Sequence, residues 1–318
     1  MSEILVTGGA GLIGSNLCRK LLELGNSVII YDNLMTSDYN NIKDIVDDKT
    51  CKFVETDLSQ NLDIKLSVDQ IYNLACPASP IHYRKDPIKT MMTSVNGANN
   101  VLKLATKLNI PVLQTSTSEV YGDPLVHPQS EEYRGNVNTL GPRACYDEGK
   151  RSAETLFMDY NRTYGTKTKI VRIFNTYGPY MHANDGRVVS NFILQALHNE
   201  DITMYGDGNQ TRSFCYVDDT VDALIRMMNS SSEILGPINI GRPAENTMID
   251  LAKLVIELTG SKSKIIYKEL PIDDPIRRKP DITKATNLLN WIPKTDLKTG
   301  LISTINYFKS VEGYVKYK

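Results

Sequence analysis

The sequence has almost no net charge and no long apolar run. Its 36 Lys and Arg residues nearly balance 37 Asp and Glu residues, which leaves a formal net charge of −1 at pH 7. A chain without a basic excess does not attract nucleic acid or anionic lipid, so neither is expected as a partner. No apolar stretch reaches the length of a membrane span, and a predicted strand begins at once, which leaves no room for a signal peptide. We therefore expect a cytoplasmic protein without membrane contact.

Cysteine and histidine are also scarce, at five and four residues. The cysteines are scattered and odd in number, a pattern typical of reduced thiols rather than of a disulfide framework. The histidines lack the spacing of metal ligands, so no metal site is expected. The composition, with 41% apolar and 23% charged residues, is that of an ordinary globular protein, and 318 residues suffice for one large domain with a smaller partner.

Residues 4–32 contain the strongest local pattern in the chain. An apolar strand leads into a glycine turn, an amphipathic helix and a second strand that ends at Asp32. The turn contains Gly8, Gly11 and Gly14. Glycines let the backbone approach a pyrophosphate, the helix N-terminus favours the phosphates, and the acid can accept both ribose hydroxyls. A turn that merely needs glycines is the alternative, but the strand, the helix and the acid all stand where a dinucleotide needs them.

Beyond Asp32, apolar runs predict strands in alternation with helices. Strands are expected at 52–55, 70–75, 112–116 and before Arg172, and helices over 88–108 and 146–160. The alternation predicts an α/β fold, a doubly wound parallel sheet (Rossmann) with a smaller C-terminal substrate-binding part. We expect a dinucleotide-binding domain over 1–178, rejoined by about 212–240, and a smaller substrate-binding domain over 179–318.

The later part of the chain is predicted to contain a helix, a strand and a final helix at 189–196, 202–205 and 301–308. Asp218 or Asp219 is expected to cap one further helix. Thr247 and Asp250 resemble a capping box at the start of another. An extended loop is expected over 271–280.

The residues that point to chemistry begin where the fifth strand ends. Ser116–Gly122 places hydroxyls and the carboxylate of Glu119 at the edge of the sheet where ligands bind. Farther on, Tyr146 and Lys150 stand four apart on a predicted helix and therefore share a face. A nearby ammonium favours the phenolate, so we expect Lys150, together with a charged nicotinamide ring, to lower the pKa of Tyr146 from ~10 toward neutrality. The plain alternative is an aromatic ring packed under an aliphatic stem, and the upstream dinucleotide turn weighs against it.

The turn Thr7–Gly14 with Thr117, Tyr146 and Lys150 resembles the motifs of the extended short-chain dehydrogenase/reductases that act on nucleotide sugars. The likeness runs essentially the whole length of the chain and includes residues 172–179 and 212–219. It implies NAD as the cofactor. The contacts to NAD that it implies come from Gly8, Gly11, Leu12, Ile13, Gly14, Asp32, Asn33, Asp57, Leu58, Leu74, Ala75, Thr115, Tyr146, Lys150, Thr176 and His182.

Segments 77–80, 117–124, 142–151 and 273–281 are most similar to the branch of this family that decarboxylates UDP-glucuronate. Thr36-Ser37 departs from that branch, in which a glycine usually follows the threonine, and residues 38–50 and 60–70 match poorly. The contacts to the nucleotide sugar that the resemblance implies come from Ser79, Glu119, Asn175, Arg187, Tyr205, Arg212 and Arg278.

Arg278 stands in a basic run, which by itself is typical of a solvated loop. The resemblance implies instead that Arg278 binds the sugar carboxylate, for which a guanidinium fork is well matched, and that Arg212 binds the nucleotide diphosphate.

The catalytic residues that the resemblance implies are Thr117, Glu119, Tyr146, Lys150 and Arg278. Oxidation at C4 of the sugar gives a ketone, which lets the C6 carboxylate leave as carbon dioxide. We expect UDP-xylose as the product, with NAD recycled in the active site, because a chain of this length holds no further domain to receive a released ketone. The helices over 91–108 and 146–164 resemble those that pair in dimeric relatives, so a homodimer is expected.

Four other functions stay open. A nucleotide-sugar 4-epimerase shares the residues through Tyr146 but needs neither a carboxylate-binding arginine nor an acid at Glu119. An oxidative decarboxylase would release the 4-keto pentose with NADH. A 4,6-dehydratase typically has an Asp-Glu pair where this chain has Ser118-Glu119, which argues against dehydration. A redox-sensing binding protein that has lost activity tends to lack the tyrosine or the lysine, and both are present here.

Overall fold

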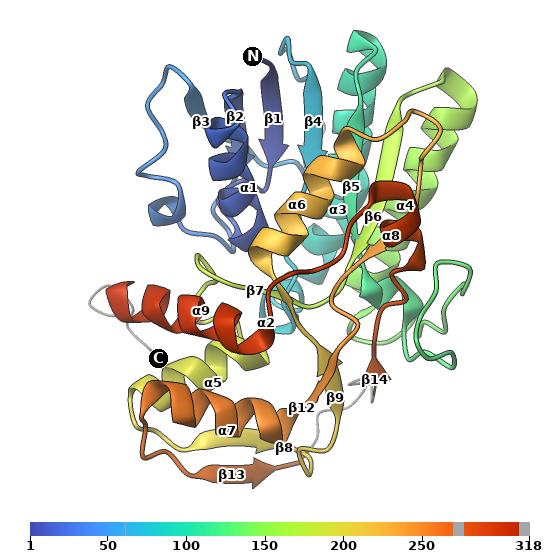
Figure 1. The fold of residues 1–318 in the computed structure, drawn as a ribbon. Coiled ribbons are helices and arrows are strands. Elements are labelled where there is room, and N and C mark those ends of the chain that lie inside the picture. Colours follow the sequence, from blue (N-terminus) through green and yellow to red (C-terminus); the bar gives the residue numbers. More distant parts are fainter. Residues whose placement is uncertain (61, 270–276, 312–318) are drawn as a thin grey trace.

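A computed structural model describes residues 1–60, 62–269 and 277–311 of the chain. Its centre is a seven-stranded parallel sheet (Figure 1). In sheet order the strands are β11 (Ile238–Ile240), β6 (Thr168–Ile173), β5 (Val112–Thr117), β4 (Gln70–Asn73), β1 (Glu3–Thr7), β2 (Ser27–Asp32) and β3 (Cys51–Glu55). The order runs outward in both directions from β1 and β4, which is the doubly wound arrangement, so the predicted fold class is confirmed.

Helices cover both faces of the sheet. Leu5 of β1 belongs to a core cluster with residues of α3 (Pro87–Leu108) and α4 (Ala144–Tyr164). Its neighbours Ile4 and Val6 belong to the other cluster, with residues of α1 (Leu12–Glu23) and α6 (Val217–Met228). Because side chains alternate across a strand, a sheet buried on both faces needs apolar residues at successive positions. The apolar runs in the sequence follow from this burial.

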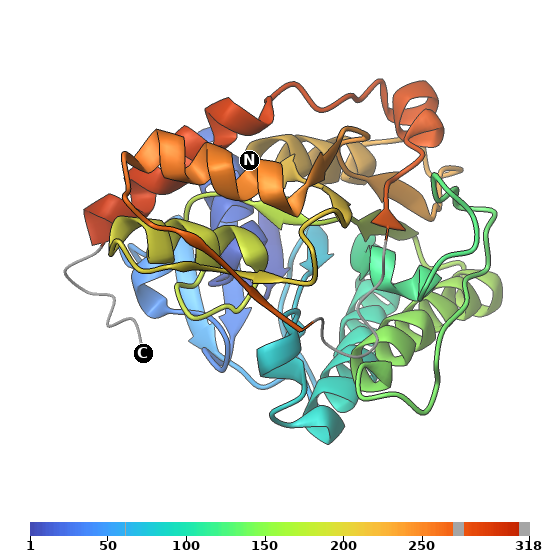
Figure 2. The same cartoon turned by 90° about the horizontal axis from the view of Figure 1, so that it is seen from below.

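A smaller layer lies beyond the carboxyl ends of the strands (Figures 1 and 2). Its helices and strands are α5 (Val188–Leu197), α7 (Met248–Thr259), α9 (Leu297–Val311), β8 (Ile202–Tyr205), β13 (Ile265–Lys268), β9 (Thr211–Ser213), β12 (Glu245–Thr247) and β14 (Arg277–Arg278). Short elements that connect the two layers or flank the sheet are η1 (Tyr39–Asn41), α2 (Pro80–Tyr83), η2 (Ser118–Tyr121), β7 (Thr176–Tyr177), β10 (Cys215–Tyr216) and α8 (Thr283–Leu289).

The predicted caps have different outcomes. Thr247 accepts a hydrogen bond from the backbone N–H of Asp250, so the predicted cap of α7 is confirmed. The cap predicted for α6 is wrong, because α6 begins at Val217 and Asp219 lies inside its first turn. The Asp219 carboxylate accepts instead from the backbone N–H groups of Lys294 and Thr295, at 3.0 and 2.8 Å. It therefore holds the segment that leads into α9.

Three strand expectations also differ from the structure. β6 continues through Arg172 to Ile173. Arg277–Arg278, predicted as part of a loop, form β14 because they pair in parallel with β9, whereas residues 271–276 of that loop lie outside the described residues. β11 has no counterpart among the predicted strands, because a three-residue strand is too short to show a period.

All five cysteines are free. In the described ranges no helix combines the length and the apolar character that a membrane crossing needs. No group of three or more His, Cys, Asp or Glu side chains that could hold a metal is found among those residues either.

Candidate active site

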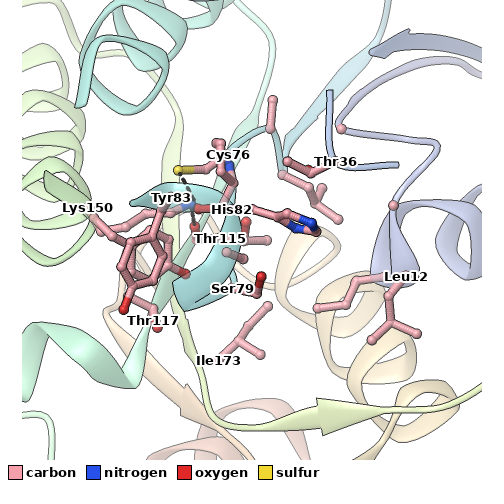
Figure 3. Close-up of a pocket in the computed structure, with 18 of the residues that line it drawn as sticks. Leu12, Thr36, Cys76, Ser79, His82, Tyr83, Thr115, Thr117, Lys150 and Ile173 are labelled. Carbon is pink, nitrogen blue, oxygen red and sulfur yellow. Dashed lines mark hydrogen bonds between the residues drawn. The ribbon is translucent and has the colours of Figure 1, made fainter. Parts of the chain in front are cut away.

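One cavity of about 320 Å³ opens at the carboxyl ends of the central strands. In Figure 3, Leu12 and Thr36 lie at one end of it, and Lys150, Tyr83 and Thr117 lie at the other. The predicted site residues that line it are Gly8, Gly11, Leu12, Ile13, Gly14, Asp32, Asn33, Leu58, Leu74, Ala75, Ser79, Thr115, Thr117, Glu119, Tyr146, Lys150, Asn175, Thr176, Arg187, Arg212 and Arg278.

Three predicted contacts are not among the lining residues. Asp57 forms an ion pair with Lys89 at 2.9 Å. The ring of His182 packs edge-on against His82, whose side chain does line the cavity. Tyr205 lies on β8 and is 44% exposed. The roles given to Asp57, His182 and Tyr205 stay predictions.

The glycine turn serves two different purposes. Gly8 has a φ of +68°, and a Cβ atom at Gly14 would stand 2.2 Å from the carbonyl oxygen of Gly8, so the fold itself excludes larger residues at both positions. A Cβ atom at Gly11 would meet only that same oxygen, at an ordinary 3.5 Å. The free space in front of Gly11 therefore belongs to the cavity and fits the close approach of a dinucleotide pyrophosphate.

Asp32 lies at the end of β2 with its carboxylate already well bonded. One oxygen accepts from the N–H of Ala10 at 3.0 Å, and the other accepts from the N–H of Leu34 and the hydroxyl of Ser37, both at 2.9 Å. Ser37, the residue that departs from the family pattern, thus orients the acid. A carboxylate offers about four acceptor sites, so the three internal bonds leave one in this arrangement. The predicted contact of Asp32 to both ribose hydroxyls stays a prediction.

Tyr146 and Lys150 lie on one face of α4, as their spacing predicts. The Nζ atom of Lys150 is 5.9 Å from the centroid of the Tyr146 ring and donates to the Thr115 carbonyl at 2.9 Å. The ring of Tyr83 is stacked on that of Tyr146, with 5.2 Å between centroids and 3° between planes. The ring of Tyr146 thus has an ammonium and a second aromatic ring as neighbours.

The side chains of the protein do not by themselves lower the pKa of Tyr146, and the predicted lowering in the presence of a charged nicotinamide ring stays a prediction. Burial raises the pKa of the phenol, and although the hydroxyl of Thr117 acts in the opposite direction, burial prevails. Burial also lowers the pKa of Lys150. The protein by itself therefore favours the neutral phenol, because burial disfavours the charged phenolate.

Glu119 is held between two arginines. Its Oε2 accepts from Arg143 at 2.5 Å, and its Oε1 accepts from Arg278. Burial raises the pKa of Glu119, but the charges of Arg278 and Arg143 outweigh burial and lower it to about 2. The acid is therefore ionised at every physiological pH.

Arg143 is the main site residue that sequence reasoning missed. It stands directly before α4, three residues ahead of Tyr146, and its side chain lines the cavity. A cation at a helix N-terminus opposes the helix dipole, so its position in the sequence was an available signal of a specific role. Tyr83, His82 and Asp185 also line the cavity without having been predicted.

A doubly wound sheet, a glycine turn at its edge and a buried tyrosine–lysine pair define a dinucleotide-dependent enzyme of the dehydrogenase type. The chain belongs to the NAD dependent epimerase/dehydratase family, whose sequence pattern matches residues 4–241.

Several known proteins are similar to the chain over nearly its whole length. It is 54% identical to UDP-glucuronic acid decarboxylase 5 of Arabidopsis thaliana, covering 94% of this chain and 87% of that protein. It is 50% identical to UDP-glucuronic acid decarboxylase 1 of Xenopus tropicalis, covering 96% and 72%. Among solved structures, UDP-glucuronic acid 4-epimerase from Bacillus cereus, in complex with UDP-glucuronic acid and NAD, has a TM-score of 0.86 at 28% identity, covering 97% and 99%.

Proposed function

We propose that the chain is an NAD-dependent UDP-glucuronate decarboxylase that forms UDP-xylose through a 4-keto intermediate. The main observation behind the proposal is that two groups of residues line the same cavity. One is the buried pair Tyr146 and Lys150, and the other is a carboxylate that accepts hydrogen bonds from two arginines. The pair suits oxidation at a sugar carbon, and the arginines suit an acidic sugar. Relatives at 50–54% identity that carry the name UDP-glucuronic acid decarboxylase support the same function.

The cofactor end of the cavity fits NAD. Gly11 leaves room for the pyrophosphate, Asp32 keeps an acceptor site for the ribose, and Thr115 with Lys150 lies toward the other end. The chemistry that NAD supplies when bound is reversible acceptance of a hydride from C4 of the sugar. The positive charge of an oxidised nicotinamide would counter the effect of burial on the pKa of Tyr146.

Tyr146 and Thr117 act on the oxygen at C4. Tyr146 accepts the hydroxyl proton while the sugar is oxidised, and the hydroxyl of Thr117 donates a hydrogen bond to the same oxygen. The C6 carboxylate is then β to a ketone, so its loss as carbon dioxide leaves an enolate on that oxygen. Tyr146 and Thr117 stabilise the enolate as donors of an oxyanion hole. A proton from solvent adds at C5, Tyr146 returns its proton to the oxygen at C4, and C4 would take the hydride back from the bound cofactor.

The substrate end of the cavity supplies the contacts to the rest of the molecule. Arg278 binds the sugar carboxylate and Arg212 binds the diphosphate. The hydroxyl of Ser79 is buried, lines the cavity and has no hydrogen-bond partner among the described residues, which supports a contact to the sugar. Residues 179–318 form the smaller, nucleotide-sugar-binding domain in this proposal, and residues 1–178, rejoined by about 212–240, hold NAD.

The test of this function follows the hydrogen that is incorporated at C5 and the number of turnovers for each molecule of NAD. In D₂O with less NAD than substrate, we expect carbon dioxide, UDP-xylose with one deuterium at C5, and more turnovers than molecules of NAD. NADH that accumulates one for one with carbon dioxide would identify an oxidative decarboxylase. A surviving carboxylate with C4 inverted would identify a 4-epimerase, the activity named for the similar Bacillus cereus structure.

We also propose that the chain forms a homodimer through α3 and α4 and works in the cytoplasm. Both helices pack against each other, and α3 keeps Ile88 and Met92 exposed, at 76% and 38%. The free cysteines suit a reducing compartment. Light scattering on the purified protein gives the mass, and a monomer at micromolar concentration would contradict the dimer.

A further inference from the structure

The carboxylate of Glu119 is shared by two guanidinium groups that come from different parts of the chain. Arg143 precedes α4, Arg278 lies on β14, and Glu119 lies on η2. All three side chains are largely buried, with exposed fractions of 19%, 4% and 15%, and all three line the cavity. Glu119 therefore holds two cations at once, one on each of its carboxylate oxygens.

Arg278 is suited to receive an anion from the cavity. A buried guanidinium group is favoured beside a negative charge, and an anionic ligand in the cavity supplies one. The Nε atom of Arg278 is buried and has no hydrogen-bond partner in the described part of the chain, so this arginine keeps an unused donor. The NH2 group of Arg278 donates to the backbone carbonyl of Gly122 across a long distance of 3.4 Å.

Asp147 is a further acid near this cluster and adds little negative charge to it below neutral pH. It is buried, and its Oδ1 has no partner among the described residues. Burial and the charge of Glu119 raise its pKa to about 7, although Arg143 and Arg278 act in the opposite direction. Asp147 is therefore mostly protonated when the pH is below 7.

We propose that Arg143 is a positioning residue that retains Glu119 while the carboxylate of an acidic sugar takes over Arg278. This inference rests on the proposed function. With Oε2 held by Arg143, Glu119 releases Arg278 without becoming a buried carboxylate that has lost every counter-ion. One carboxylate replaces another at Arg278, so the number of ion pairs is maintained.

The position of Arg143 also connects this exchange to Tyr146. The Arg143 carbonyl accepts from the backbone N–H groups of Tyr146 and Asp147, at 3.0 and 3.1 Å, in the first turn of α4. The ion pair with Glu119 offsets the unfavourable interaction of the cation with the helix dipole. Arg143 thus sets the position of Glu119 relative to the phenol that acts on the sugar.

The experiment compares Arg143→Gln in two backgrounds. Both carry Tyr146→Phe, which prevents turnover, and one also carries Glu119→Gln. Calorimetry with NAD present measures the affinity for UDP-glucuronate and for UDP-glucose, a neutral sugar that has no carboxylate to exchange. Arg162→Gln, at an exposed arginine of α4, is the matched control.

With Glu119 present, Arg143→Gln should weaken UDP-glucuronate binding at least about tenfold, the lower end for one charge-assisted hydrogen bond. UDP-glucose binding should change less than about threefold, because independent sites do not couple. In the Glu119→Gln background the effect on UDP-glucuronate should also fall below about threefold, because no carboxylate is left to retain. Arg143→Lys should recover part of the affinity, since an ammonium can still hold Oε2.

Three results would overturn the inference. An equal loss of UDP-glucuronate affinity in both backgrounds would make Arg143 a direct substrate ligand. An equal loss for both sugars would make its role structural. Full affinity in Arg143→Gln would mean that Glu119 needs no second cation. Failure of the proposed function looks different, because the parent protein would then not prefer UDP-glucuronate over UDP-glucose and the wild-type chain would release no carbon dioxide.

Discussion

The two ends of the cavity are built in different ways. The cofactor end comes from one contiguous strand–turn–helix–strand unit that ends at Asp32, and its shape is set by backbone geometry at Gly8 and Gly14. The substrate end joins three separate segments through charge, and Arg278 stands 159 residues from its partner Glu119. Changes at the first end should therefore act through shape and stability. Changes at the second should act through ion pairs and depend on the charge of the ligand.

Tyr146 lies between the two ends, and its loss should have the largest effect. Tyr146→Phe removes the proton acceptor, so decarboxylation of UDP-glucuronate should fall by ~10²–10⁴-fold. The stacking on Tyr83 needs only the ring, so the fold and NAD binding should be kept. Release of carbon dioxide measures the loss, and activity within about threefold of wild type would remove Tyr146 from its proposed role.

The preference for NAD over NADP tests the cofactor end of the cavity. A second negative charge near the buried carboxylate of Asp32 costs about 3 kcal/mol, so NAD should bind on the order of 100-fold more tightly than NADP. Titration of the protein with each cofactor measures the ratio. Equal affinities would show that the adenosine ribose lies away from Asp32.

Substitution of Arg278 tests the substrate end of the cavity. Arg278→Ala should weaken UDP-glucuronate binding by at least about 30-fold, as expected when one member of a buried charge pair is truncated, and leave NAD binding intact. Arg162→Ala, at an arginine whose side chain is 66% exposed, should change neither. Unchanged activity of Arg278→Ala on UDP-glucuronate would assign the carboxylate to another residue.

Substitutions at two glycines should have different effects, one on NAD binding and the other on the stability of the fold. Gly11→Ala should weaken NAD binding about tenfold with little change in Tm, because its Cβ meets only open cavity and one oxygen at 3.5 Å. Gly14→Ala should lower the Tm, because its Cβ would stand 2.2 Å from a backbone oxygen. Equal effects of the two variants on Tm would contradict this division.

The smallest expected effect is a pH-dependent change in stability at Asp147. Its pKa is about 7 in the fold and 3.8 ordinarily, so the folded chain binds this proton more tightly than the unfolded chain. Stability is then lost as the pH rises through that interval. Asp147→Asn removes the loss, so its Tm relative to wild type should be a few degrees higher at pH 8 than at pH 5. Asp159→Asn, on the exposed side of α4, should show no such trend, and a Tm difference for Asp147→Asn that stays constant with pH would refute the assignment.

The sequence alone determined the elements whose signal is local. Apolar runs predict the strands from β1 to β6, the glycine spacing predicts the turn, and a spacing of four residues brings Tyr146 beside Lys150. Each of these features depends on neighbours within a few residues, and the periods of strand and helix are visible over that distance.

Tertiary structure decided what distant segments do to one another. It brought Arg143 to Glu119, made Arg278 part of a strand, and used Asp219 to hold another segment rather than to cap its own helix. It also raised the pKa of Tyr146, because the assembled cavity buries the phenol. Ion pairs and desolvation depend on which side chains come into contact after folding. These contacts join segments that are far apart in the sequence, so no periodicity or residue spacing predicts them.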